Sequence, residues 1–190
     1  MLDRRKAIAT LMANRPKDLF VVPGLGSTTY DMASLGEKDQ DFYLWGAMGG
    51  AAMIGLGLAL AKPSVKVAVI TGDGEMLMGM GSLATIGVQR PANLAIVVFD
   101  NQHYGETGMQ PSHTDSGVDL VGVSRACGIR QTLEVQDQAS LETLAALLGS
   151  FRETLFARVR IAADEPTRVL PSKDGVELKL RFRKAVAAAG

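Results

Sequence analysis

Apolar and polar positions follow two different periods along the chain. Short segments rich in apolar residues predict strands at residues 19–22, 42–44, 66–71, 94–99, 129–135 and 156–162. The nearly unbroken runs at 66–71 and 94–99 are typical of strands that are buried on both faces of a sheet. Between them, apolar residues that recur every three or four positions predict helices, at residues 3–14, 78–89, 119–127, 139–151 and 176–189. This alternation predicts an α/β fold: a mainly parallel sheet in a three-layer α/β/α arrangement, forming a single domain over residues 1–190.

A segment rich in glycine and alanine, residues 45–61, is apolar on all sides. It falls just short of the roughly 18–20 residues that suggest a membrane span, and its small side chains suit close helix packing in water. We therefore predict a buried helix from Gly46 to Leu60 at a subunit interface, so that the chain self-associates. Replacing Gly55 or Gly57 with a bulky residue is expected to weaken that association.

Charge and cysteine content narrow the classes of partner. Lys plus Arg and Asp plus Glu both number 20, so no overall field favours nucleic acid or an acidic membrane. Cys127 is the only cysteine, which excludes an internal disulfide and a multi-cysteine metal site, and its apolar surroundings predict a buried structural thiol. The first six residues lack the apolar core of a signal peptide, which predicts a cytoplasmic protein.

Polar side chains follow two strands that are consecutive in the predicted sheet. The run 66–71 leads into Gly72-Asp73-Gly74, and the run 94–99 leads into Asp100-Asn101. The carboxyl ends of parallel strands meet at one edge of the sheet, where open α/β sheets bind ligands. A carboxylate and a side-chain amide suit a Mg²⁺ that keeps phosphate and water as its other ligands. Glycines on both sides of Asp73 would let backbone N–H groups approach a diphosphate.

These residues resemble the motif that binds thiamine diphosphate (ThDP) and Mg²⁺ in ThDP-dependent enzymes. The stretch from Asp100 to Pro111 narrows the resemblance to the sulfopyruvate and phosphonopyruvate decarboxylase group, and the similarity runs from about Leu19 to Ile161. It implies the ThDP-binding fold, with ThDP and Mg²⁺ as cofactors.

The resemblance also implies roles for individual residues. Asp73 and Asn101 would bind Mg²⁺, together with the backbone carbonyl of His103. The cofactor-binding residues it implies are Met48, Gly49, Gly50, Gly72, Gly74, Glu75, Met76, Tyr104 and Gly105. Met48 would be the apolar wedge under the bent cofactor, the alternative being an ordinary core methionine. The Glu75 side chain is expected to point to solvent, since an acid beside a phosphate is unfavourable.

Three residues of the loop after Asn101 are candidates for catalysis. Glu106 stands where related decarboxylases tend to have a small hydroxyl residue; it could act as acid/base or alter specificity, or it could be a solvated loop glutamate. His103 and His113 flank the same loop and could relay protons or bind an acidic group, although surface histidines are common. Asp100 replaces an asparagine often found in the family, which should matter little if only Asn101 touches the metal.

The family's second domain has no counterpart in this chain. In related enzymes that domain supplies a glutamate that activates the aminopyrimidine ring of ThDP. One sheet uses the whole chain, so the glutamate is expected from a separate pyrimidine-binding (PYR-domain, alpha) subunit. The chain is then the diphosphate-binding (beta) subunit of a two-component 2-oxoacid decarboxylase that acts on 3-sulfopyruvate or 3-phosphonopyruvate and releases an aldehyde and CO₂.

Other functions remain open at this stage. The chain could serve a ThDP-dependent carboligase or a 2-oxoacid–ferredoxin oxidoreductase, whose β subunit is also a separate ThDP-binding chain. It could also be a non-catalytic partner protein that keeps the ThDP fold, although the intact Asp73 and Asn101 argue against this.

Overall fold

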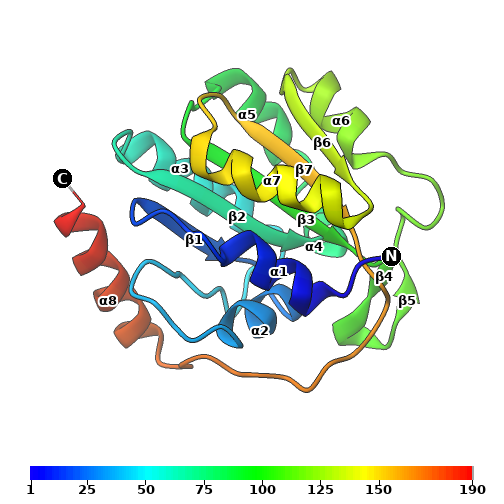
Figure 1. Cartoon of the computed structure of the whole chain (residues 1–190), viewed down its shortest axis with the longest axis horizontal. Coiled ribbons are helices and arrows are strands. Elements are labelled where there is room, and N and C mark those ends of the chain that lie inside the picture. The colour runs from blue at the N-terminus through cyan, green and yellow to red at the C-terminus, as the bar shows by residue number, and fades with distance from the viewer. Residues whose placement is uncertain (190) are drawn as a thin grey trace.

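The computed structural model describes residues 1–189, and its centre is a parallel sheet of five strands in the order β1-β2-β3-β7-β6. The strands are β1 (Leu19–Pro23), β2 (Lys66–Gly72), β3 (Leu94–Asp100), β6 (Gln131–Val135) and β7 (Leu155–Arg160). All four neighbouring pairs are parallel, so every strand ends at the same edge of the sheet (Figure 1). The predicted mainly parallel α/β sheet is confirmed.

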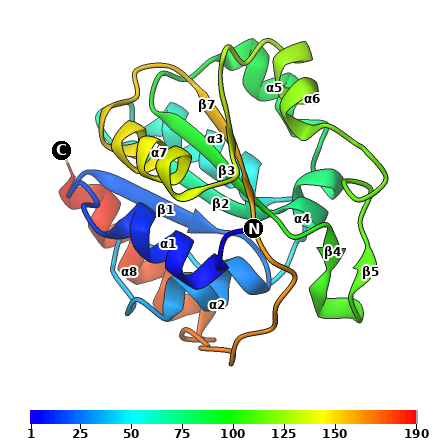
Figure 2. The same cartoon turned by 45° about the vertical axis from the view of Figure 1, so that its right-hand side comes forward.

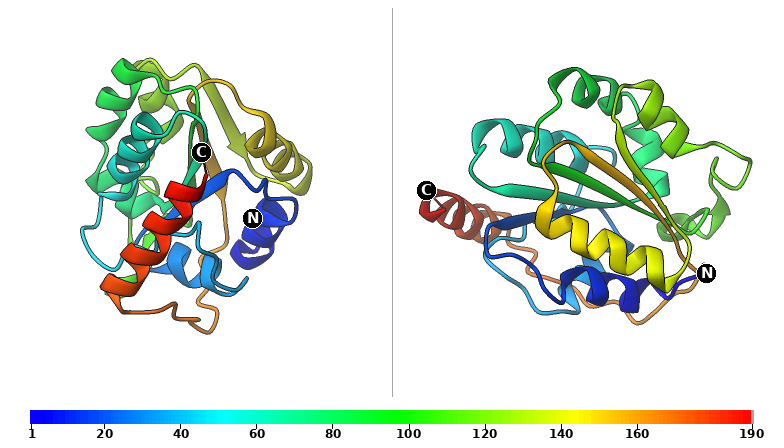
Figure 3. Two further views of the ribbon diagram at one scale, coloured as in Figure 1. Left: turned by 90° about the vertical axis from the view of Figure 1, so that its left-hand side faces the viewer. Right: turned by 45° about the horizontal axis from the view of Figure 1, so that its top comes forward.

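Helices cover both faces of this sheet, because side chains alternate between the two faces along each strand. Along β3, Ala95, Val97 and Phe99 enter one hydrophobic cluster, whereas Leu94, Ile96 and Val98 enter the other. The first cluster packs under α1 (Arg4–Met12), α2 (Ser27–Ala33) and α7 (Gln138–Ser150). The second packs under α3 (Ala51–Ala61), α4 (Asp73–Met78), α5 (Ser82–Gln89) and α6 (Leu120–Ala126). The sheet lies between these two layers (Figure 3, left).

A short hairpin stands beside the carboxyl edge of the sheet. It is formed by β4 (His103–Tyr104) and β5 (Gln110–Pro111), which are antiparallel and enclose a 3₁₀ turn at Gly105–Thr107. Figure 2 shows the hairpin next to α4. The loop after Asn101 is therefore folded back on itself above the ends of the central strands.

Residues 162–174, which we call the strap, connect β7 to the C-terminal helix α8 (Gly175–Ala188). The strap passes the N-terminal helix, where Arg4 Nη1 donates to the Asp164 carbonyl (3.3 Å) and Arg5 donates to the Thr167 carbonyl. Helix α8 then docks beside β1 (Figure 1), and its Phe182 ring meets Phe20 edge-on at 5.6 Å between ring centroids. The strap and α8 thus cover the edge of the sheet that β1 forms.

Two of the predicted elements are wrong in detail around the glycine-rich segment. Residues 42–44 do not form a strand; only Asp41 makes an isolated bridge, to Val21. The helix expected from Gly46 begins at Ala51, because Ala47 (φ 56°) and Gly49 (φ 93°) adopt left-handed backbone conformations that a right-handed helix excludes.

The helix predicted at 78–89 is confirmed from Ser82 to Gln89, but its start is wrong, because a separate helix ends at Met78. Helix α4 begins directly after β2 at Asp73 and ends at Met78, and α5 begins at Ser82. Gly79 between them packs so closely against the backbone of Gly49 that a Cβ there would overlap the Gly49 carbonyl. The break follows from this contact between two segments that are distant in sequence.

The expected roles of Gly55 and Cys127 need correction. A Cβ on Gly55 would overlap Val69 of β2, so this glycine faces the chain's own sheet and no neighbouring subunit. Gly57, with nothing within 4 Å of the same position, lies on the exposed face of α3 with Met53 and Leu60. Cys127 is half-buried, less enclosed than predicted.

Across residues 1–189, none of the helices combines the length and the apolar character that crossing a membrane requires.

Candidate cofactor and metal site

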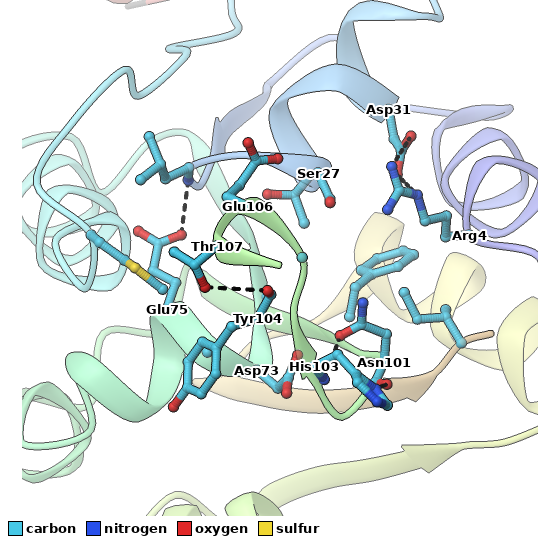
Figure 4. A pocket seen from close by; sticks show the side chains of 18 of the residues that line it. Arg4, Ser27, Asp31, Asp73, Glu75, Asn101, His103, Tyr104, Glu106 and Thr107 are labelled. Atoms are coloured by element: carbon cyan, nitrogen blue, oxygen red, sulfur yellow. Dashed lines mark hydrogen bonds and ion pairs between the residues drawn. The ribbon is translucent and has the colours of Figure 1, made fainter. Parts of the chain in front are cut away.

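A cavity of about 270 Å³ opens at the carboxyl edge of the sheet. Its wall comes from several parts of the chain: the N-terminal helix, the turn after β1, the segment before α3, the β2–α4 junction and the loop after β3 (Figure 4). Of the residues predicted for the site, those that line the cavity are Met48, Gly72, Asp73, Gly74, Glu75, Asn101, His103, Tyr104, Gly105 and Glu106. The structure thus brings together the two strand ends that the sequence singled out.

Asp73 is the first residue of α4, and its side chain is buried beneath the cavity. Its Oδ2 atom accepts hydrogen bonds from the hydroxyls of Ser112 and Thr114, the second at 3.2 Å. Burial raises the pKa of Asp73 to about 6; the Ser112 hydroxyl opposes this shift and the nearby Asp100 carboxylate adds to it. A carboxylate removed from water in this way is best stabilised as an anion by a cation.

Asn101 and His103 share the first turn of the loop after β3. Asn101 Oδ1 accepts the His103 backbone N–H at 2.9 Å, and His103 Nδ1 lies 2.8 Å from the Asn101 carbonyl oxygen. Both residues line the cavity. The His103 ring is therefore folded back on its own turn, although it remains at the cavity wall.

The donor set fits Mg²⁺ better than a transition metal. Within residues 1–189, no three His, Cys, Asp or Glu side chains gather into a group that could hold a metal ion by themselves. At the ends of β2 and β3 the cavity offers the buried carboxylate of Asp73 and the amide oxygen of Asn101, whereas the buried carboxylates of Asp31 and Glu75 are engaged by other groups of the chain. Such a partial set of hard oxygen donors suits an ion that takes its remaining ligands from phosphate and water, whereas structural zinc sites use four protein ligands.

Glu75 does not face solvent, and the sequence-based expectation for its side chain is wrong. It is buried, and its Oε2 atom accepts the Leu25 N–H and the Thr71 hydroxyl, each at 2.9 Å, while Oε1 accepts the Gly49 N–H at 3.3 Å. Burial raises the pKa of Glu75, against the effect of these hydrogen bonds. The carboxylate thus ties the turn after β1 to the segment before α3 (Figure 4).

Gly74, Tyr104 and Met48 meet on one side of the cavity. A Cβ on Gly74 would lie 2.6 Å from the Tyr104 ring and 3.5 Å from the Met48 methyl carbon. Met48 itself is 36% exposed at the cavity wall, so it is not an ordinary core methionine. A larger residue at position 74 would push the Tyr104 ring from its place.

Four predicted site residues lie outside the cavity wall. Met76 is buried in the hydrophobic core, and Gly50 is the residue before α3. Gly49 contacts Gly79 and donates to Glu75. His113 is exposed, with Nδ1 3.2 Å from the Tyr104 hydroxyl oxygen, and so reaches the cavity only through that tyrosine.

Glu106 is engaged by two side chains at the cavity rim. Its Oε2 atom lies 3.4 Å from Nη2 of Arg168 in the strap, and it accepts the Tyr30 hydroxyl at 3.4 Å. The Arg168 guanidinium lies over the Tyr30 ring, 5.4 Å from its centroid. This glutamate is therefore part of a small cluster with Arg168 and Tyr30.

The cavity wall also includes residues from the first 31 positions of the chain, which were not predicted from the sequence. Ser27 and Thr28 at the start of α2 line the cavity, as do Arg4 and Asp31, which form a buried ion pair with 2.9 Å between Nε and Oδ2. Gly24-Leu25-Gly26 before two hydroxyl residues was a usable signal, because such turns after a strand suit phosphates. No comparable signal marked Arg4.

Comparison with known proteins identifies the fold and the family of this chain. Its fold matches the crystal structure of benzoylformate decarboxylase from Polynucleobacter necessarius, with a TM-score of 0.72 at 22% identity over 87% of this chain and 34% of that one. Residues 24–156 match the family described as thiamine pyrophosphate enzyme, C-terminal TPP binding domain. The chain belongs to this family of thiamine pyrophosphate enzymes, as the resemblance implied.

Two sets of relatives differ in how much of their length the chain covers. Phosphonopyruvate decarboxylase of Streptomyces viridochromogenes is 40% identical over 87% of this chain, which spans only 38% of that protein. Sulfopyruvate decarboxylase subunit beta of Methanococcus maripaludis is also 40% identical, over 96% of this chain and 97% of that subunit. The chain therefore corresponds to about two fifths of the first protein and to nearly all of the second.

Proposed function

We propose that this chain is a single diphosphate-binding domain that acts as the beta subunit of a two-component 2-oxoacid decarboxylase. The observation that carries the proposal is the buried Asp73 beside Asn101 in a cavity at the carboxyl edge of the sheet. A chain of this family with that pair intact is equipped to hold Mg²⁺ and the diphosphate of ThDP.

Each part of the site then has a role in binding. Asp73 and Asn101 would hold Mg²⁺ with the His103 carbonyl, and the backbone from Gly72 to Glu75 would face the diphosphate. Met48, next to Gly74 in the cavity wall, would support the cofactor from below. When bound, ThDP supplies the nucleophile and the electron sink for loss of CO₂ from a 2-oxoacid.

The substrate is proposed from the relatives: 3-sulfopyruvate or 3-phosphonopyruvate, each giving the corresponding aldehyde and CO₂. Both carry a second anion, which requires a cationic partner. The Arg168 guanidinium, which lines an adjoining cavity that shares Asn101 and Glu106 with the first, carries such a charge, though it is paired with Glu106. Glu106 therefore decides how much of that charge a substrate meets.

A separate chain is proposed to supply the activating glutamate. The two glutamates at the cavity wall are both engaged, Glu75 with Thr71 and backbone N–H groups and Glu106 with Arg168 and Tyr30. The relatives that match this chain over nearly their whole length are each named as subunit beta of sulfopyruvate decarboxylase, which also supports a partner subunit. We propose a hetero-oligomer of this chain with a pyrimidine-binding subunit.

The test is to co-purify the chain with its natural partner and to measure CO₂ release from 3-sulfopyruvate, 3-phosphonopyruvate and pyruvate without an electron acceptor. We expect release by the complex and none by the purified chain alone. Robust turnover by the single chain would contradict the need for a partner. Release that appears only when an electron acceptor is added would instead indicate an oxidoreductase.

A further inference from the structure

Asp100, the last residue of β3, is completely buried next to the metal-type residue Asn101. Strand β7 runs beside β3 in the register Val98 to Arg158 and Asp100 to Arg160, so both arginines share the face on which Asp100 lies. Asp100 Oδ2 is 2.5 Å from Arg158 Nε and 3.8 Å from Arg160 Nη1. Arg158 is thus the counter-ion of this buried carboxylate.

The other oxygen of Asp100 is directed to the loop that carries the site. Asp100 Oδ1 accepts the Gln102 backbone N–H at 2.9 Å and the Thr114 hydroxyl at 2.8 Å. Gln102 has a φ of 64°, a conformation that non-glycine residues seldom adopt. Asp100 therefore fixes both the left-handed turn after Asn101 and the far end of the loop.

Thr114 lies between Asp100 and Asp73. Its Oγ1 atom is 2.8 Å from Asp100 Oδ1, 3.2 Å from Asp73 Oδ2 and 2.9 Å from Ser112 Oγ. A hydroxyl carries one proton and an ionised carboxylate can only accept, so Thr114 donates to one carboxylate at a time. When Thr114 donates to the nearer Asp100, Ser112 is the remaining hydroxyl donor to Asp73.

We infer that Asp100 is a positioning residue for the metal-binding carboxylate, acting through Thr114 and neutralised by Arg158. The inference rests on the proposed function, because it assigns Asp73 to Mg²⁺. By fixing Thr114, Asp100 holds the Ser112 and Thr114 hydroxyls against Asp73 Oδ2, so that this carboxylate keeps one orientation towards the metal. An asparagine at position 100 could donate from its amide and reverse the chain of hydroxyls, and Arg158 would keep only Glu134 as a counter-ion, at 3.5 Å.

The test measures metal affinity, with activity as a secondary readout. Mn²⁺ is titrated into the partner-reconstituted complex in the presence of saturating ThDP, and free Mn²⁺ is followed by electron paramagnetic resonance. Thr114→Val removes the hydroxyl at nearly constant shape, and we expect affinity to fall about 10- to 100-fold, the usual effect of losing an outer-sphere partner. Thr114→Ser should keep most of the affinity. Thr154→Val is the matched control, since that buried hydroxyl bonds the Pro91 carbonyl away from the site.

A double variant separates positioning from general destabilisation. Asp100→Asn alone should weaken Mn²⁺ binding to a similar degree, and Asp100→Asn with Thr114→Val should add little, because both act on Asp73 through one chain of contacts. If Asp100→Asn does not fold, the difference in Mn²⁺ affinity between Thr114→Val and Thr114→Ser tests the positioning role by itself.

The possible results separate this inference from the proposed function. Variants at Thr114 and Asp100 that bind Mn²⁺ like the wild type, or losses that simply add, would overturn the positioning role and leave the proposed function standing. A wild-type complex that binds no Mn²⁺ with ThDP would overturn both.

Discussion

Asp73 is held in the folded chain in an environment that opposes its charge. Burial raises its pKa from 3.8 to about 6. A carboxyl group with a raised pKa binds its proton more tightly in the folded than in the unfolded state. This contribution to stability is fully present below pH 3.8 and is lost as the pH rises through about 6. The metal-free chain is therefore destabilised by ionised Asp73 at neutral pH.

We predict that Asp73→Asn makes the metal-free chain more stable at pH 8, by about 3 kcal/mol, and that this gain disappears at pH 4. The same variant should lose Mg²⁺-dependent ThDP binding. Urea unfolding at the two pH values and calorimetric cofactor titration of the partner-reconstituted complex measure the two effects. A variant less stable than wild type at pH 8 would show that hydrogen bonds from Ser112 and Thr114 outweigh burial, and unchanged ThDP affinity would remove Asp73 from the site.

Glu106→Gln separates the three roles open to that residue. The variant keeps the shape but removes the negative charge beside Arg168. We expect kcat/KM for 3-sulfopyruvate relative to pyruvate to rise about 3- to 10-fold in the reconstituted enzyme, because Arg168 loses its competing anion. A fall of about 100-fold or more in kcat for both substrates would instead identify an acid/base role. No change would identify a surface glutamate.

The main strands follow from the sequence because each is specified locally. Strands β2, β3 and β7 have six to seven residues, nearly all buried, and their apolar runs predict this environment directly. The division between α4 and α5 depends on the contact of Gly79 with Gly49, thirty positions earlier, and no local pattern contains it. Likewise, Asp73 and Asn101 were predictable from two strand ends, whereas the burial of Glu75 depends on Leu25 and Gly49 arriving from other segments.

Helix α3 offers a matched pair of glycines for a test of association. Met53, Gly57 and Leu60 form an exposed apolar stripe, whereas Gly55 faces Val69. We predict that Gly57→Leu leaves the fold intact but weakens assembly, while Gly55→Leu destabilises the sheet itself. Analytical ultracentrifugation and thermal unfolding of both variants give the comparison. Normal assembly of Gly57→Leu, or a monomeric wild type at micromolar concentration, would contradict self-association through α3.

At the scale of the whole molecule, the strap is held at both of its ends by residues from the N-terminal part of the chain. Leu2 bridges to Ile161, the residue before the strap, and Trp45 Nε1 donates to the Ser172 carbonyl at 2.8 Å near its other end. Helix α8 completes the closure by placing Phe182 against Phe20 and Phe42. The C-terminal part of the chain therefore supports β1 and the turn after it, which forms one wall of the cavity.

We predict that Phe182→Ala lowers the free energy of unfolding by about 3 kcal/mol, since a buried aromatic ring leaves a cavity when it is truncated. ThDP affinity should change much less, because Phe182 does not line the cavity. Val176→Ala, on the exposed side of the same helix, is the control. Equal stability of the two variants in urea unfolding would mean that α8 is not docked in solution.

The buried charge at Asp73 has a consequence for the fate of the protein in the cell. A ligand that binds only the folded state stabilises it by about 2.7 kcal/mol at one hundred times its dissociation constant, and the metal also relieves the unfavourable charge. Unfolded molecules are removed by proteases. We expect the wild-type chain, followed by pulse-chase labelling, to have a shorter half-life under thiamine starvation, and Asp73→Asn to be insensitive to it. Vitamin supply would then set the abundance of this protein through its degradation, without any dedicated regulator.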